Sequence, residues 1–219
     1  MSVREHFQDD LEGLKELIKD LAKDVRQRLD EAVYTLYHKD VEGAQKIIDD
    51  DKELDQKELI INEKAILLIT KEQPFATDLR RLIIALKISS DLERMADHAV
   101  NIAKSTLRLG EAHSLTIHPN IDKMCAKAID MVTLAIQAFE QEDITLAKKL
   151  ADLDDEIDAM HSQVIRDMLQ HTESNPEVIQ HIMQMAFSSR YIERFADHIT
   201  NIGENVFYLV KGETYDLNK

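Results

Sequence analysis

Residues 89–105 read SSDLERMADHAVNIAKS, and residues 189–205 read SRYIERFADHITNIGEN. The two stretches are identical at eight of seventeen positions when they are offset by 100, whereas about one identity is expected by chance. This extent of identity indicates that the chain contains two copies of one unit. Because the identical positions are mostly polar, the repeat is expected to preserve a function as well as a fold.

A second repeated stretch lies upstream of each copy. Residues 40–55, DVEGAQKIIDDDKELD, align with residues 143–158, DITLAKKLADLDDEID, at an offset of 103, and seven of the sixteen positions are identical. The duplication therefore extends over most of each half of the chain.

Long helices are the expected state of almost the whole chain. Charged residues make up 32% of the 219 residues, while glycine and proline number only five and three, which is typical of long soluble helices. Apolar residues recur every three or four positions between residues 11 and 36, which predicts a first long helix. We expect a second helix from about 41 to 71, ending before Gln73-Pro74, and a third from about 76 to 109.

The same order of elements is expected after a linker at residues 110–119, GEAHSLTIHP. Helices are predicted from about 120 to 139, from the corner at 141–143 to about 171, and from a turn at Ser174-Asn175-Pro176 to about 211, where Gly212 closes the last helix. The predicted fold is all-α, with six long helices forming two tandem, pseudo-symmetric three-helix bundles over residues 1–111 and 112–219.

Pairs of acidic residues four positions apart occur in both repeated stretches. Side chains at this spacing lie on the same face of a helix, and the two helices of each half that carry such pairs must run antiparallel, because a short turn joins them. Four carboxylates on one patch form an all-oxygen site for a hard cation. The predicted metal ligands are Asp51, Asp55, Glu93 and Asp97 in the first half and Asp154, Asp158, Glu193 and Asp197 in the second.

Histidine and asparagine residues flank these carboxylates and are candidates for the surroundings of the metal. They are His98, Asn101, His198 and Asn201. We expect about one metal cluster in each repeat, and the sequence leaves Mg, Mn, Fe and Zn open, although zinc more often recruits imidazole or thiolate ligands. The alternative is that the acidic pairs are solvated, with Arg94 and Arg194 forming ordinary ion pairs beside them.

Composition excludes several classes of function. A formal net charge of −15 disfavours direct binding to nucleic acid. No phosphate-binding loop, dinucleotide-binding turn or nucleophile elbow occurs, so a nucleotide-using enzyme is not expected. No apolar run approaches the ~20 residues that cross a bilayer, and the N-terminus has no apolar signal segment. A cytoplasmic location is therefore expected.

The repeated DLERMADHAVNIA and YIERFADHITNIGE motifs, together with EQPFATDLRRLIIALKISSDLER at residues 72–94, resemble those of the PhoU family over essentially the whole chain. The resemblance implies metal at the acidic motifs and a non-catalytic, cytoplasmic negative regulator of the bacterial phosphate-starvation response. It further implies two partners, a PhoR-type sensor histidine kinase and the PstB-type ATPase of a phosphate transporter, through which the chain would be peripheral to the membrane. The long, apolar-striped first helix also suggests a homodimer.

The two copies differ in ways that bear on partners. Tyr191 stands where the first copy has Asp91, and the second copy lacks the Arg80-Arg81 pair, which is therefore a candidate partner-binding site present only once. Two other functions stay open at this point. One is a metal-dependent hydrolase or iron-handling bundle, and the other is an accessory protein of a low-affinity phosphate permease.

Overall fold

The computed structural model describes residues 3–174 and 179–217, and it is helical almost throughout. Seven helices and no strand occur in these ranges. They are α1 (Val3–His38), α2 (Val41–Asp49), α3 (Lys52–Glu72), α4 (Ala76–Leu109), α5 (Pro119–Gln141), α6 (Ile144–Ser174) and α7 (Ile179–Lys211).

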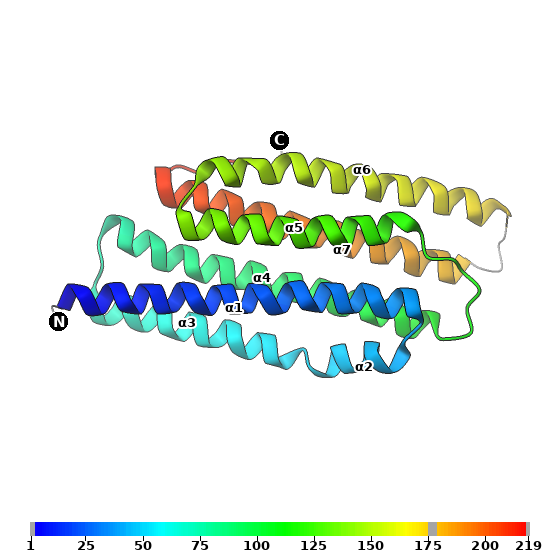
Figure 1. The fold of residues 1–219 in the computed structure, drawn as a ribbon, viewed down its shortest axis with the longest axis horizontal. Coiled ribbons are helices and arrows are strands. Elements are labelled where there is room, and N and C mark those ends of the chain that lie inside the picture. The colour runs from blue at the N-terminus through cyan, green and yellow to red at the C-terminus, as the bar shows by residue number, and fades with distance from the viewer. Residues whose placement is uncertain (1–2, 175–178, 218–219) are drawn as a thin grey trace.

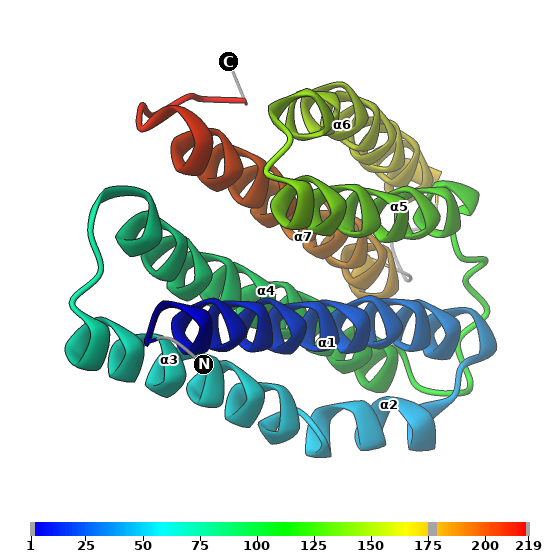
Figure 2. The ribbon, with the colours of Figure 1, turned by 60° about the vertical axis from the view of Figure 1, so that its left-hand side comes forward.

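The helices form two bundles that lie side by side along a common long axis (Figure 1). The first bundle contains α1, α2, α3 and α4, and the second contains α5, α6 and α7. Figure 2 shows the second bundle lying above the first. The predicted all-α fold of two tandem three-helix bundles is confirmed, because α2 and α3 together take the place of one helix. The predicted boundary between residues 111 and 112 stays a prediction.

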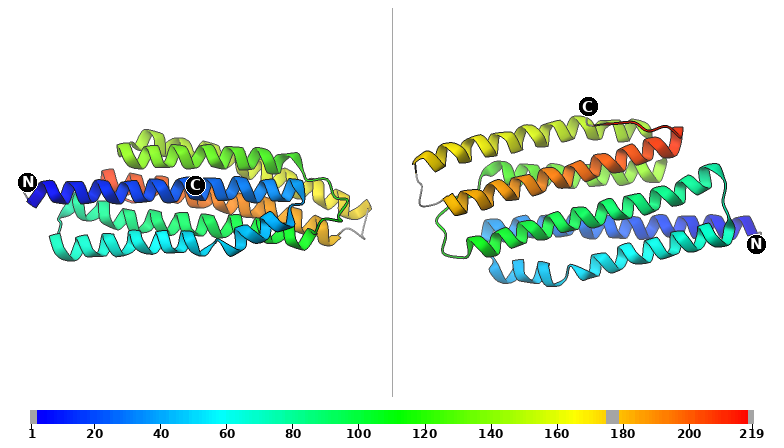
Figure 3. Two further views of the ribbon diagram at one scale, coloured as in Figure 1. Left: turned by 60° about the horizontal axis from the view of Figure 1, so that its bottom comes forward. Right: turned by 180° about the vertical axis from the view of Figure 1, so that it is seen from behind.

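The two bundles meet chiefly where α4 lies against α7, a contact that we call the seam. The two helices run in opposite directions along it, as seen from behind in Figure 3. Contacts across the seam follow this antiparallel order. Lys87 lies over the ring of Tyr208, and the ring of His98, further along α4, lies 6.2 Å from the ring of Tyr191.

The apolar stripe of α1 faces the core of its own chain. Leu14, Ile18, Leu21, Val25 and Leu29 are all buried, with exposed fractions of 2% or less. Burial of this stripe confirms the prediction of the first helix. It also removes the stripe as a surface for self-association.

The predicted second helix is wrong in one respect, because it is broken into α2 and α3 at Asp50 and Asp51. Three consecutive aspartates repel one another here, and the Arg28 guanidinium donates to the backbone carbonyls of Ile47 (2.7 Å) and Asp50 (3.5 Å). The bond to Ile47 satisfies a carbonyl group at the end of α2, whereas the carbonyl of Asp50 also accepts from the N–H of Glu53 at 3.2 Å. The corresponding region of α6 continues without a break.

The turns between helices agree largely with the sequence. Gln73 adopts a left-handed conformation at the end of α3, and Gly212 does so after α7, where its N–H donates to the Tyr208 carbonyl. Gly110, with a φ of 68°, ends α4 before the linker, which is non-helical up to His118. The turn predicted at Ser174-Asn175-Pro176 falls mostly on residues 175–178, which lie outside the described residues, and α6 extends to Ser174, three residues beyond the prediction.

Candidate metal centres

The second half of the chain buries two carboxylates. Asp154 of α6 is 6% exposed and Glu193 of α7 is 8% exposed. The Oδ1 atom of Asp154 and the Oε2 atom of Glu193 are buried and accept no hydrogen bond. Burying ionised oxygens without a partner is costly, so both atoms are suited to a positively charged ligand.

Two further carboxylates share this patch. Burial, followed by repulsion from Asp158, Asp197 and Glu193, raises the pKa of Asp154 to about 7. Burial, followed by the charge of Asp197, likewise raises the pKa of Glu193 to about 6. The carboxylates of α6 and α7 therefore act on one another, as the spacing of the acidic pairs predicted. We call this set the second carboxylate site.

The first half contains the matching set on α3 and α4. Burial and then the charges of Asp55 and Asp97 raise the pKa of Asp51, the residue immediately before α3. Burial and then Asp97 raise the pKa of Glu93. This first carboxylate site is shallower than the second, because Asp51 and Glu93 are half-buried while Asp55 and Asp97 are exposed.

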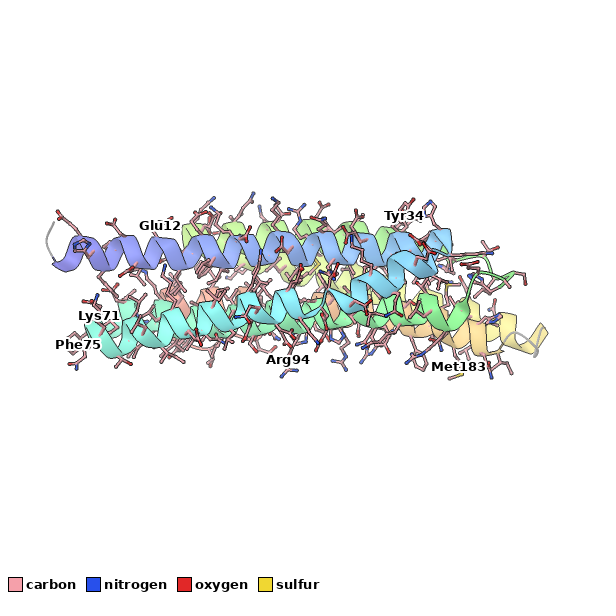
Figure 4. The ribbon with its side chains drawn as sticks, turned by 90° about the horizontal axis from the view of Figure 1, so that it is seen from below. Glu12, Tyr34, Lys71, Phe75, Arg94 and Met183 are labelled. Atoms are coloured by element: carbon pink, nitrogen blue, oxygen red, sulfur yellow. The ribbon has the colours of Figure 1, made fainter. Side chains whose placement is uncertain are left out.

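Basic residues are distributed unequally between the two sites. In the second site Arg190 donates to Glu193 Oε1, and Arg194 donates to Asp197 Oδ2 at 2.9 Å. In the part of the chain that the structure describes, no ion pair involves Glu93 or Asp97. The Arg94 side chain extends outward from the middle of α4 (Figure 4). The alternative reading of arginine ion pairs therefore holds for Arg194 and not for Arg94.

The carboxylates share patches without forming a finished coordination sphere. Within residues 3–174 and 179–217, no three Asp, Glu, His or Cys side chains are already grouped closely enough to hold a metal ion. The oxygen-only donor set and the unpartnered oxygens of Asp154 and Glu193 nevertheless fit a hard cation. The eight predicted ligands therefore stay a prediction.

The histidine and asparagine residues beside the acidic pairs do not share one environment. His198 Nδ1 lies 3.0 Å from Asp91 Oδ1, and Asn201 donates to the same oxygen at 3.2 Å. These two side chains therefore contact the opposite bundle across the seam, whereas they were predicted to surround a metal. Asn101 is half-buried on α4.

His98 lies at the seam beside its counterpart from the other copy. Its ring centroid is 5.6 Å from that of His198. Burial and the positive charges of neighbouring groups lower the pKa of His98 to about 4. The neutral imidazole of His98 is therefore the form present near neutral pH.

Asp91 is a residue whose structural role the sequence did not assign. Its carboxylate joins the two bundles through His198 and Asn201. The only signal in the sequence was its absence from the second copy, where Tyr191 replaces it. One residue is enough to make this contact across the seam between the two bundles, so it need be present in only one copy of the repeat.

The arginine pair also has an internal role. Arg81 donates to Glu142 Oε1 at 2.7 Å and to Asp78 Oδ1 at 2.8 Å. Arg80 donates to Thr77 at 3.2 Å. The Arg81 guanidinium thus joins α4 to the corner between α5 and α6, and the partner-binding role predicted for Arg80 and Arg81 stays a prediction.

Comparison with protein families matches the repeat directly. A family model described as the PhoU domain matches this chain twice, over residues 18–106 and 121–206. This chain belongs to the PhoU domain family. The two matches fall on the two bundles, so each bundle is one PhoU domain.

Several PhoU relatives are similar over nearly their whole length. A phosphate-specific transport system accessory protein PhoU homologue of Aquifex aeolicus is 37% identical over 204 residues, covering 93% of this chain and 92% of that protein. The PhoU protein of Escherichia coli is 27% identical over 209 residues, covering 95% and 87%. The crystal structure of the phosphate transport system regulatory protein PhoU of Streptococcus pneumoniae has a TM-score of 0.90 at 30% identity and covers 96% and 99%.

Membership of the PhoU family decides the class of protein. Its named members are accessory and regulatory proteins, and this chain is accordingly a regulatory accessory protein and not an enzyme. Among the described helices, none is both long and apolar enough to cross a membrane.

Proposed function

We propose that this chain is a cytoplasmic, metal-binding adaptor that restrains the phosphate-starvation response. Its partners would be a PhoR-type sensor histidine kinase and the PstB-type ATPase of a phosphate-specific transporter. The PhoU family match over both halves, together with relatives named as accessory proteins of phosphate-specific transport, supports this assignment. The net charge of −15 is consistent with protein partners in place of nucleic acid.

The observation that carries the metal-binding part is the pair of buried oxygens, Asp154 Oδ1 and Glu193 Oε2, that accept no hydrogen bond. Mg, Mn, Fe or Zn would be held by the eight carboxylates of the two sites, with Asp51, Asp55, Glu93 and Asp97 matching Asp154, Asp158, Glu193 and Asp197. A bound cation would supply the positive charge that these side chains lack. Such binding would also join α3 to α4 and α6 to α7.

An adaptor of this kind can control a kinase only by binding one of the kinase conformations more tightly than another. The rigid pair of bundles offers a long surface for such a contact. Metal at the carboxylate sites would change the charge of that surface, because the bound cations would offset part of the negative charge of the two acidic patches. Metal could thereby set the affinity for the kinase or for the transporter ATPase.

The proposal is tested by analysing the metal content of the purified chain and its binding to the two partners. Asp97→Asn combined with Asp197→Asn is expected to reduce metal content and to change kinase binding, whereas Asp152→Asn, an exposed acid of α6, is the control. Deletion of the coding sequence is expected to make expression of phosphate-starvation genes constitutive. Normal regulation after deletion would contradict the signalling role.

A further inference from the structure

The two carboxylate sites differ most in one residue. At the offset of 100, Glu193 corresponds to Glu93 and Arg194 corresponds to Arg94, but Arg190 corresponds to Ser90. The structure uses this difference, because the Arg190 guanidinium donates to Glu193 Oε1. The first site has no counterpart of this contact.

A guanidinium and a metal ion compete for the same carboxylate oxygens. Arg190 occupies Oε1 of Glu193, while Oε2 of the same carboxylate is buried without a donor. Charge-assisted hydrogen bonds of this type are among the strong ones in proteins. A cation that binds through Glu193 must therefore displace Arg190, or share the carboxylate with it at a cost in repulsion.

Burial explains why the second site holds an arginine and the first does not. Glu193 and Asp154 are nearly inaccessible to water, so an uncompensated charge there would be costly in the metal-free protein. Glu93 is only half-buried and Asp97 is exposed, so water can solvate the first site when no cation is bound.

We propose that the Arg190 guanidinium occupies the cation position of the second carboxylate site in the metal-free protein. Metal therefore fills the first site, which has no such arginine, at a lower concentration than the second. This inference rests on the proposed metal binding and adds an order to it. The side chain of Arg190 is 41% exposed, so it can swing away into solvent when a metal ion takes its place. Filling of the second site then releases a guanidinium beside the seam.

Arg194 also binds this site, since it donates to Asp197 Oδ2 at 2.9 Å, but it is not the residue in which the two sequences differ. It has a counterpart in Arg94, its side chain is 50% exposed, and its nearest approach to Glu193 is 3.9 Å. Arg190 instead corresponds to a serine, Ser90. The two residues can therefore be exchanged between the sites by substitution. Arg190→Ser gives the second site the residue of the first, and Ser90→Arg gives the first site the residue of the second.

The test is calorimetric titration of the metal-free, full-length chain with Mn²⁺. The unmodified protein is expected to show two classes of site, the tighter lost in Asp97→Asn and the weaker lost in Asp197→Asn. Arg190→Ser is expected to tighten the weaker class about tenfold or more, since a hydrogen bond to a charged group no longer has to be broken. Ser90→Arg is expected to weaken the tighter class.

Two controls separate this effect from others. Arg166→Ser removes a positive charge from α6 where Arg166 contacts Gln163, and it should leave both classes unchanged. If Arg190→Ser does not fold without metal, Ser90→Arg still decides the question, because the first site is partly solvated. Mn²⁺ binding with affinities unaltered by both exchanges would overturn the role of Arg190, whereas no Mn²⁺ binding by any variant would overturn the proposed metal binding itself.

Discussion

At the scale of single residues, Asp154 is a carboxylate that the fold buries without a positively charged side chain bonded to it. Its carboxylate is 6% exposed, and its Oδ1 atom lacks a hydrogen-bond donor. Arg190 and Arg194 bond to Glu193 and Asp197 but not to Asp154. In the metal-free protein, a proton is therefore the simplest means of neutralising Asp154.

The raised pKa of Asp154 predicts a dependence of stability on pH. Because burial and neighbouring charges raise this pKa from 3.8 to about 7, the folded state holds a proton that the unfolded chain has already released. Stability of the metal-free protein is thus expected to fall as the pH rises from about 4 to 7 and to level off above that. Asp154→Asn should remove this part of the slope and raise the melting temperature at pH 8 by a few degrees, on the order of 2–4 °C per kcal/mol gained.

The measurement is thermal unfolding of chelator-treated protein at several pH values. Asp152→Asn, which removes an exposed acid two positions earlier on α6, should keep the slope of the unmodified protein. Equal slopes for Asp154→Asn and the unmodified protein would show that Asp154 is already ionised at low pH.

At the scale of elements, the break between α2 and α3 is the feature that distinguishes the first bundle from the second. It places Asp51 at the start of α3, where its carboxylate is acted on by Asp55 and Asp97. Arg28 of α1 contacts this break, and its guanidinium donates to the carbonyls of Ile47 and Asp50.

Removal of Arg28 should destabilise this corner. Arg28→Ala leaves the carbonyl of Ile47 without its donor and removes one of the two donors to the carbonyl of Asp50, which also accepts from the N–H of Glu53. The loss is expected to cost about 1–3 kcal/mol. Chemical denaturation should show the loss, with the exposed Lys23→Ala of the same helix as the control. Arg28→Lys should have an intermediate effect, because a single ammonium group cannot reach both carbonyls as the planar guanidinium does.

The outer face of α3 carries the apolar surface that α1 does not provide. Leu59, Ile60, Ile66 and Leu67 are between 44% and 61% exposed, and Phe75 after the helix is 85% exposed. A standard interface buries about 800 Å² per partner, so these five side chains would form part of such an interface. If the proposed homodimer forms, this face is the one that we expect it to use.

Leu67→Lys is therefore expected to shift the protein toward the monomer, because it puts a charge in the centre of this face. Light scattering coupled to size-exclusion chromatography measures the change in mass. Leu169→Lys, at a residue of α6 that is 63% exposed, is the matched control. A dimer that persists in Leu67→Lys and dissociates in Leu169→Lys would place the interface on the other bundle.

At the scale of the whole molecule, the seam makes one body of two repeated domains. Asp91 of the first domain binds His198 and Asn201 of the second, and Arg81 binds Glu142. Asp91 and Arg81 have no identical counterpart in the second copy, whereas His198 and Asn201 correspond to His98 and Asn101. Specialisation of the two halves therefore allowed a fixed arrangement between them.

Loss of the Asp91 carboxylate should weaken the contact between the two domains. Asp91→Ala leaves His198 and Asn201 without their common acceptor, at an expected cost of about 1–3 kcal/mol. The unfolding transition should move to lower temperature or separate into two steps. Glu111→Ala, at an exposed position of the linker, should have little effect, and a comparable loss in that control would argue against a specific role for Asp91.

The sequence by itself determined the helices, the duplication and the two acidic patches. Helix periodicity and the same-face relation of residues four apart are local properties of a helix, so Glu93 with Asp97 and Glu193 with Asp197 could be paired without a structure. A short turn also fixes the antiparallel neighbour, which brought Asp51 and Asp154 to the correct patches.

Only the tertiary structure decided how deeply each acidic patch is buried and which side chains form ion pairs or hydrogen bonds with the carboxylates. The burial of Asp154, the contact of Arg190 with Glu193 and the bond of Asp91 to His198 depend on packing between helices distant in sequence. The contact of Arg28 with the break at Asp50 also comes from another helix. Desolvation and ion pairing are set by the whole surroundings of a side chain, so two copies of one motif acquired different electrostatic environments.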